Sequence, residues 1–496
     1  MRFKVAPSDF LQPQLLPCAH LTGPDRYLWK SQIHWDGDLL VAQRVPPESG
    51  FFHLLADVPG WGRTLLSTAW LMEQEKTYHL QVELARGQLH LLRGQYREWT
   101  ALGLQPGEET QGHLQQAFAF LREAVVASQD AAKAGRLAVQ SLVASLHAGE
   151  HLVQHYVRQG LPVRLHQPDL SPPWLGMNLG RTVPEGKFAE SLKDVFHAVQ
   201  VALCWRDVQT GEDQYHWDCP DHQLRWAREH GVRCIGGPLL GFHDLAAPDW
   251  LLLYHGDLTN LRQLLSEFVE QTVTRYRGQV DLWHCAAGIN GNTHMELSEE
   301  EHLVLAARAV ELAHRLDPET PAIVSFDQPW AEYMAQQEVE PPLYLADMMV
   351  RAGVPLSGVG LELNWGYHPG GSLPRDLLAL NQLIDRWSLL GLPLYVFLTI
   401  PSHTSPDPLA SDQAQVMLRN AEGHWGAEDQ AQLVRQIAGL LATKPVVQGV
   451  CWNQLQDNQP HRFPHGGLVD AQGHPKPAWL RFKQLRRKFD SELEKD

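Results

Sequence analysis

The stretch FVEQTVTRYRGQVDLWHCAAG, residues 268–288, contains the structural unit that is repeated through most of the chain. Up to Gly278 its apolar residues recur at intervals of three and four, which predicts an amphipathic helix that ends at the glycine. Residues 280–287 then form a nearly continuous apolar run of strand length, as expected for a strand that helices cover. A helix leading into a buried strand is the building unit of an α/β fold.

The same alternation continues beyond residue 167, where the Pro-rich segment QPDLSPPW marks a change in sequence texture. Eight apolar runs alternating with helical segments predict a (β/α)8 TIM barrel over residues 167–496. In such a barrel the functional side chains lie at the C-terminal ends of the strands. The predicted strands are residues 174–180, 196–203, 232–239, 280–287, 322–327, 357–363, 392–399 and 446–452.

The N-terminal third of the chain has a different pattern. Residues 1–108 contain short runs with partial alternation, such as 50–58, 78–84 and 88–94, separated by turn residues, and they predict a β-sandwich-like domain before the barrel. Residues 109–166 carry apolar positions at helical spacing in two segments and predict a helical hairpin. The sequence therefore predicts three regions, of which the last is the α/β barrel.

The composition limits the classes of partner. The 496 residues carry a formal net charge of −16, which argues against nucleic acid and favours a neutral ligand. No apolar run of roughly eighteen residues predicts a membrane span, and the first residues, MRFKVAPSDF, include no apolar signal region. Six scattered cysteines without a CxxC pair indicate reduced thiols. We expect a cytoplasmic protein, and a signal removed from the chain would permit secretion instead.

A series of motifs in the barrel region resembles one known family. Within residues 220–250, His243, Pro248 and Trp250 match a strand that ends in a GHTLVWHSQ-P-W pattern, and VSFDQP keeps Asp327 of a FYNDYN-like motif. LSGVGLELN is similar to IDGIGLQSH, LGLPLYVFLTIPS to LGLPVHITELDVS, and GGLVDAQGHPKPAW to LLFD-PKPAY. The order and spacing resemble family 10 of the glycoside hydrolases, the xylanase family, over about residues 174–488.

The resemblance also implies a loss. That family has an Asn-Glu pair whose glutamate donates the proton, and this pair aligns with Ala287 and Gly288 in that order. The family's nucleophilic glutamate aligns with Leu398. The Asn-Glu pair of the second strand falls within VALCW, which has no carboxylate. The family's retaining mechanism needs two carboxyl groups about 5 Å apart. We therefore expect a divergent barrel in which both catalytic glutamates of the family are absent.

Two carboxylates remain as catalytic candidates. Glu362 and Asn364 end the sixth predicted strand, two residues apart, so their side chains share one face. Asp327 ends the fifth strand, beside Glu362 in barrel order. A pair of carboxylates at adjacent strand ends can act as acid and base, or as acid and nucleophile. The alternative is that both are structural carboxylates held by neighbouring cations.

Other side chains near the strand ends are candidates for substrate binding. Tryptophan rings stack on sugar faces, and the chain has seventeen of them. The alternative is that these groups anchor loops or fill the core. The candidate binding residues are Asn364, Trp365, His243, Asp244, His284, Trp205, Trp250 and Trp452.

A metal centre is a less favoured interpretation. His243 and His284, with Asp327 and Glu362, would lie on neighbouring strands of one barrel face, like the scattered ligands of barrel metallohydrolases. No HExxH motif and no strand-one HxH motif accompanies them, and no GxGxxG motif indicates a dinucleotide. We expect neither a metal nor a cofactor.

Two hypotheses for the function follow. The first is a glycoside hydrolase that acts on a neutral polysaccharide or oligosaccharide with relocated catalytic carboxylates, Glu362 being the main one. The second is a non-catalytic carbohydrate-binding or scaffold protein on the same barrel. The predicted β-sandwich fits both, because such domains often serve as carbohydrate-binding modules beside barrels, which is an argument by analogy. Either way the expected partner is a carbohydrate.

Overall fold

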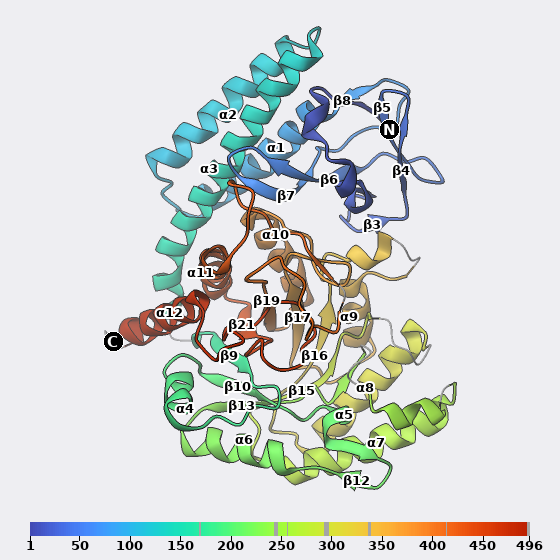
Figure 1. Cartoon of the computed structure of the whole chain (residues 1–496), viewed down its shortest axis with the longest axis vertical. Coiled ribbons are helices and arrows are strands. Elements are labelled where there is room, and N and C mark those ends of the chain that lie inside the picture. The colour runs from blue at the N-terminus through green and yellow to red at the C-terminus, as the bar shows by residue number, and fades with distance from the viewer. Residues whose placement is uncertain are drawn as a thin grey trace.

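The structure, a computed structural model, describes residues 1–167, 170–242, 247–254, 256–291, 297–335, 339–412 and 414–493. Two small sheets and three long helices from the N-terminal third lie together at one end of the molecule's long axis, and the barrel occupies the other end (Figure 1). The TIM-barrel prediction is confirmed.

Eight parallel strands close the barrel. Their order is β13-β10-β9-β21-β19-β17-β16-β15, and β13 also pairs with β15, which completes the circle. The short strand β14 (Leu240–Gly241) continues beside the end of β15. Each strand begins and ends within a few residues of its predicted position. The strands are β9 (Trp174–Asn178), β10 (Ala198–Val201), β13 (Arg233–Gly236), β15 (Leu282–Ala287), β16 (Ala322–Asp327), β17 (Gly358–Asn364), β19 (Leu394–Thr399) and β21 (Val447–Trp452).

Helices surround the strands and receive their outward side chains. On β17, Leu361 and Leu363 point into the large core between strands and helices, whereas a Cβ on Gly360 would meet Ser325 and Phe397 inside the barrel. Alternate residues therefore face the barrel interior. The surrounding helices are α4 (Gly186–Lys193), α5 (Trp205–Val208), α6 (Asp218–Glu229), α7 (Leu258–Tyr276), α8 (Glu299–Leu316), α9 (Pro342–Arg351), α10 (Leu377–Trp387), α11 (Ala427–Thr443) and α12 (Pro477–Leu493).

The lower part of the barrel interior is packed with apolar side chains, including Ile235, Leu282, Ile323 and Phe397. This filling closes the barrel below, so that a ligand can enter only above it. Asp327, Asn364 and Thr399 are the last residues of β16, β17 and β19, at the C-terminal ends where functional side chains were predicted.

The N-terminal region contains two four-stranded sheets that share a core. The rings of Phe3 and Phe52, one from each sheet, stack with their centroids 4.8 Å apart. The first sheet is β4 (Gln32–Asp36), β5 (Leu39–Gln43), β1 (Arg2–Lys4) and β8 (Tyr78–His79), and the second is β3 (Leu28–Trp29), β2 (His20–Thr22), β6 (Phe51–Val58) and β7 (Gly62–Ser67).

The strands predicted within residues 78–94 are wrong, apart from the two residues of β8. The helix α1 runs from Leu80 to Ala101. Its buried leucines include Leu80, Leu84 and Leu92, at multiples of four residues, so one helix face is buried against the sheets and the barrel. The alternation in LQVEL had indicated a strand, and the longer helical period decides the structure.

The predicted helical hairpin corresponds to α2 (Glu108–Val126) and α3 (Ala131–Leu165). The break between them lies at residues 127–130. Asp130 begins α3 by accepting a hydrogen bond from the backbone N–H of Lys133 at 3.0 Å. The domain boundaries at residues 108 and 166 remain predictions.

Helices α1 and α3 pack directly against the barrel. Leu89 and Trp99 of α1 and Leu152 of α3 belong to the same core as the barrel helices. Near the end of α3, Arg164 donates to the carbonyl oxygens of Ala442 and Val447 at 2.6 and 2.5 Å. No helix among the described residues is long and apolar enough to cross a membrane.

Candidate active site

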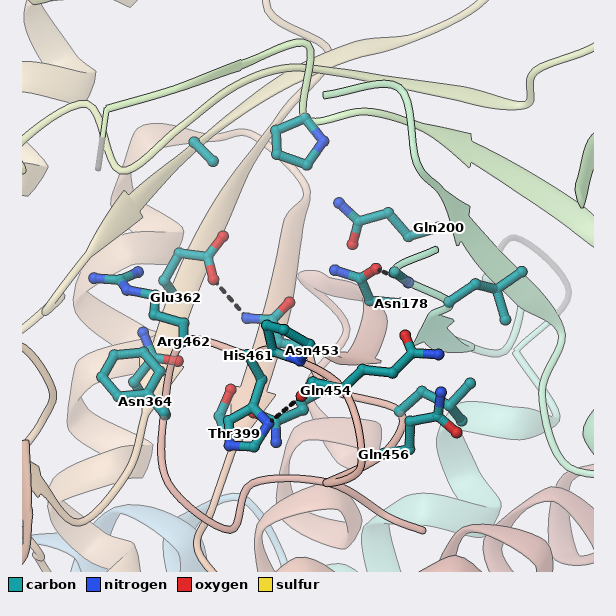
Figure 2. A pocket seen from close by; sticks show the side chains of 18 of the residues that line it. Asn178, Gln200, Glu362, Asn364, Thr399, Asn453, Gln454, Gln456, His461 and Arg462 are labelled. Atoms are coloured by element: carbon teal, nitrogen blue, oxygen red, sulfur yellow. Dashed lines mark hydrogen bonds between the residues drawn. The ribbon is translucent and has the colours of Figure 1, made fainter. Parts of the chain in front are cut away.

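A cavity of about 250 Å³ opens at the C-terminal mouth of the barrel; we call it the mouth cavity. The ends of β9, β10, β17 and β19 and the loop after β21 supply its walls (Figure 2). Its lining is rich in uncharged amides, which offer both hydrogen-bond donors and acceptors. The amide residues are Asn178, Gln200, Asn364, Asn453, Gln454, Gln456 and Gln459.

Glu362 is the single carboxylate among the described residues that line the mouth cavity. Ser325 Oγ donates to Oε1 at 2.9 Å, and Asn453 Nδ2 donates to Oε2 at 2.7 Å (Figure 2 shows the contact with Asn453). Burial, followed by the negative charge of Asp327, raises the pKa of Glu362 to about 7. Glu362 can therefore hold a proton near neutral pH, as a general acid must.

A chain of hydrogen bonds connects Glu362 to Ser325, His284 and Gln200 on other strands of the barrel. Gln200 Nε2 lies 3.3 Å from His284 Nδ1, and His284 Nε2 lies 2.9 Å from Ser325 Oγ. Burial lowers the pKa of His284 to about 3, so this imidazole is neutral and carries one proton. Ser325 Oγ therefore lies between the His284 ring and Glu362, and its hydroxyl donates to the carboxyl group.

Asp327 is adjacent to Glu362 in the strand register but is oriented for a different task. Its Oδ1 accepts from Asn364 Nδ2 at 2.9 Å, and its Oδ2 accepts from Arg462 Nη2 at 2.7 Å. The side chain is buried and does not line the mouth cavity. Asp327 thus fixes Arg462 and Asn364, both of which do line the cavity.

In the sequence, the family's two glutamates align with Gly288 and Leu398, and in the structure these two positions face different sides of the barrel wall. Ala287 and Gly288 reach the mouth cavity without a functional side chain. Leu398 points away from the cavity into the core between strands and helices, whereas Phe397 and Thr399 face inward. A carboxylate at position 398 would therefore be directed away from a ligand, and β19 has none elsewhere along its length.

Three of the four tryptophans predicted to bind substrate are buried and do not line the mouth cavity. Trp365 packs edge-on against Trp330 with their centroids 5.5 Å apart, and Trp205 stacks on Phe268 at 5.2 Å. Trp452 is fully buried and donates from Nε1 to the carbonyl oxygen of Gly466. These large rings bury more apolar area in the core than they could on a sugar face.

Trp250 is half-buried and also lies outside the mouth cavity. Its Nε1 donates to the carbonyl oxygen of Gln209 at 3.2 Å. His243 and Asp244 lie outside the described residues. Of the predicted binding residues, Asn364 and His284 line the mouth cavity together with Glu362.

Several polar residues of the site were missed by the sequence analysis. Asn178 ends β9, Gln200 lies on β10, and Asn453 directly follows β21. Each interrupts an apolar strand at or near its C-terminal end, and that interruption was the available signal. Arg462 carried no such signal, because it comes from a loop that only the fold brings to Asp327.

Comparison with known proteins places these observations in a family. The sequence model of the family described as Glycosyl hydrolase family 10 matches residues 187–482. Xylanase 10B from Thermotoga petrophila, solved with xylobiose, superposes with a TM-score of 0.50 at 16% identity, over 66% of this chain and 96% of that one. Native xylanase 10B from Thermotoga maritima gives 0.50 at 16% identity, over 67% and 98%.

No curated protein sequence matches the chain. At 16% identity the structural likeness shows the barrel fold alone, whereas the family match covers more than half of the sequence. The closed barrel, the motif order and this match agree, and the chain belongs to glycoside hydrolase family 10.

Proposed function

We propose that the protein binds a neutral saccharide in the mouth cavity and hydrolyses its glycosidic bond with Glu362 as the general acid. The observation that carries the proposal is a carboxyl group with its pKa raised to about 7, at the C-terminal mouth of a family 10 barrel. Perturbed carboxyl groups of this kind concentrate at catalytic sites.

The amide-rich lining supports a neutral saccharide as the ligand. Amide groups pair with sugar hydroxyls as donors and acceptors without requiring a charge on the ligand. The formal net charge of −16 disfavours polyanions. The Thermotoga petrophila xylanase was solved with xylobiose, which is itself a neutral sugar, and this supports the same class of ligand here.

In the proposed reaction Glu362 donates its proton to the glycosidic oxygen as the bond to the sugar breaks. Ser325 and Asn453 already donate to the two carboxyl oxygens, so they stabilise the carboxylate that remains. A water molecule then bonds to the sugar carbon that the leaving group has left. It keeps one proton in the new hydroxyl group and gives the other to Glu362, which restores the acid form. Glu362 is the one carboxyl group of the described cavity lining, and it acts in this reaction as the general acid.

A second candidate is saccharide binding without hydrolysis. Retaining and inverting glycosidases use two carboxyl groups that flank the bond. Asp327 has hydrogen-bond partners on both of its oxygens and is held in an ion pair by Arg462. Because both oxygens of Asp327 are already bound, Glu362 has no free carboxylate partner among the described lining residues. This favours a binding or scaffold role.

The substitution Glu362→Gln separates the two candidates. Under hydrolysis, release of reducing ends from a panel of neutral glycans falls by about 100-fold or more in this variant, the range for loss of a general acid, while the melting-temperature rise caused by ligand is kept. Glu83→Gln, at a buried carboxyl of α1, is the matched control and retains activity. Full activity in Glu362→Gln removes Glu362 from the reaction. A wild-type protein that binds glycans but releases no reducing ends establishes the binding role.

A further inference from the structure

A second cavity, of about 330 Å³, lies between the N-terminal sheets and the barrel; we call it the interface cavity. The sheet that contains β6 and β7 forms one wall, and α1 and α10 form others. These elements meet where the N-terminal region rests on the barrel (Figure 1). The interface cavity shares no lining residue with the mouth cavity.

Two arginines line the interface cavity without a carboxylate partner in the described part of the chain. Arg26 lies 3.4 Å above the ring of Phe51, and its Nη1 donates to Ser67 Oγ at 3.3 Å. Arg386, from α10, lies 5.8 Å from the ring centroid of Tyr27. Arg26 also has a φ of 65°, a conformation that costs free energy in a residue with a side chain and that concentrates at ligand sites.

Other positively charged or basic groups lie close to these two arginines. Burial and then the charge of Arg386 lower the pKa of Arg26 to about 10. The pKa of His53 is well below its usual value through burial, with additional repulsion from His20, Arg26 and Arg375. In both groups burial is the larger cause of the lowered pKa, and repulsion between nearby positive charges adds to it.

The acidic groups that line the cavity are already engaged. Asp376 accepts from Gln88 Nε2 at 2.6 Å and from the backbone N–H of Ala379 at 2.8 Å, which caps α10. Glu98 accepts from Gln95 Nε2 at 3.2 Å. Arg375, the third arginine of the lining, is paired with Glu332 at 2.6 Å.

Burial lowers the pKa of Arg386, and Tyr27 and then Asp25 oppose that shift. Asp25 is the one carboxyl group among these causes. It is exposed and does not line the interface cavity. Arg26 and Arg386 are therefore the two arginines of the lining that have no carboxylate within ion-pair distance among the described residues.

We propose that the interface cavity binds an oxyanion, either the carboxylate of an acidic sugar or a phosphate group, between Arg26 and Arg386. Guanidinium groups match both anions with paired N–H donors. Partly buried, uncompensated cations are costly, and an anionic ligand removes that cost. Ser67 on β7 and His90 on α1 add polar groups to the lining. The proposal is independent of catalysis at Glu362.

The test is calorimetric titration of the full chain with glucuronate, with inorganic phosphate, and with glucose as the neutral match. Wild type binds at least one of the anions and not glucose. Arg386→Gln and Arg26→Gln each weaken that binding about tenfold or more, as for loss of one charged contact of roughly 1.4 kcal/mol. Arg351→Gln, which removes an exposed arginine on α9, binds as wild type does.

A second measurement separates binding from a structural role. Without ligand, Arg386→Gln melts no lower than wild type, because the change removes an uncompensated charge. With ligand, it loses the rise in melting temperature that wild type shows. Binding of glucuronate alone indicates an acidic saccharide, and binding of phosphate alone a phosphorylated ligand. Absence of binding to both anions, or unchanged binding in both variants, overturns the proposal.

Discussion

At the scale of single residues, the site depends on two neighbouring carboxyl groups with different surroundings. Asp327 and Glu362 are direct partners in the register of β16 and β17. Arg462 neutralises Asp327 in an ion pair, whereas Glu362 receives only neutral donors and is buried. Environments that separate two adjacent carboxyls in this way are how proteins assign one group to hold charge and the other to hold a proton.

The raised pKa of Glu362 predicts a stability change with pH. The folded pKa of about 7 lies above the ordinary value of 4.5, so the folded state binds the proton more tightly than the unfolded state. The contribution of Glu362 to stability is therefore full below about pH 4.5 and is lost as the pH rises to about 7, by up to roughly 3 kcal/mol. Denaturant unfolding of Glu362→Gln and wild type at pH 5 and pH 8 measures this. The variant gains relative to wild type as the pH rises, and a constant difference contradicts the prediction.

Removal of the ion pair at Asp327 predicts a second effect. Asp327→Asn takes one of two carboxylate partners from Arg462, which also donates to Asp412 at 3.1 Å. We expect a loss of about 3 kcal/mol in unfolding free energy, as for a broken buried pair. The pKa of Glu362 should also fall, because the negative charge that raises it is gone. Titration of Glu362 by NMR checks the shift, and Asp347→Asn, in an exposed pair on α9, serves as the control.

At the scale of elements, the barrel was predictable because its signal is repeated. Eight apolar runs alternate with helices, and each observed barrel strand overlaps its predicted run. The five residues LQVEL do not predict the helix at residues 80–101. Apolar residues at alternate positions over so short a stretch fit the period of a strand as well as that of a helix. The positions of the tryptophan rings were not predictable for a different reason. Proximity to a strand end does not say on which side of the strand a ring lies, and Trp365 and Trp452 lie on the side of the helices.

The glycines of α1 give a prediction about how closely this helix packs. A Cβ on Gly87 would lie 2.0 Å from the carbonyl oxygen of Ser67 on β7, whereas a Cβ on Gly94 would meet nothing within 4 Å. Gly87→Ala should therefore destabilise the protein by about 1–3 kcal/mol. Gly94→Ala should stabilise it by roughly 0.5–1 kcal/mol, because alanine favours a helix. Thermal unfolding of both variants is the measurement, and equal effects of the two changes would show that α1 does not lie close against β7.

At the scale of the whole molecule, the N-terminal helices and the barrel share one core. Leu89, Trp99 and Leu152 pack with residues of the barrel helices, and Arg164 connects α3 to the carbonyl oxygens of Ala442 and Val447. Interfaces between independent domains are usually smaller and more polar. The three regions predicted from the sequence differ in residue pattern, but one hydrophobic core includes residues of all three.

This continuity predicts a single unfolding transition by calorimetry, with equal calorimetric and van't Hoff enthalpies. Arg164→Leu should shift that one transition downward, because two buried carbonyl groups lose their donor at about 1–3 kcal/mol each. Arg136→Leu, an exposed position on the same helix, leaves it in place. Two separate transitions, with only one moved by Arg164→Leu, would mean that the regions unfold independently.

The burial of the tryptophans has an optical consequence. No tryptophan lines the mouth cavity within the described residues, so a saccharide that binds there leaves indole emission nearly unchanged. Trp330, by contrast, lines the interface cavity and lies 4.4 Å below the guanidinium of Arg375. An anion that enters beside it alters the polarity around that ring. Fluorescence can therefore report occupation of one site while remaining silent about the other.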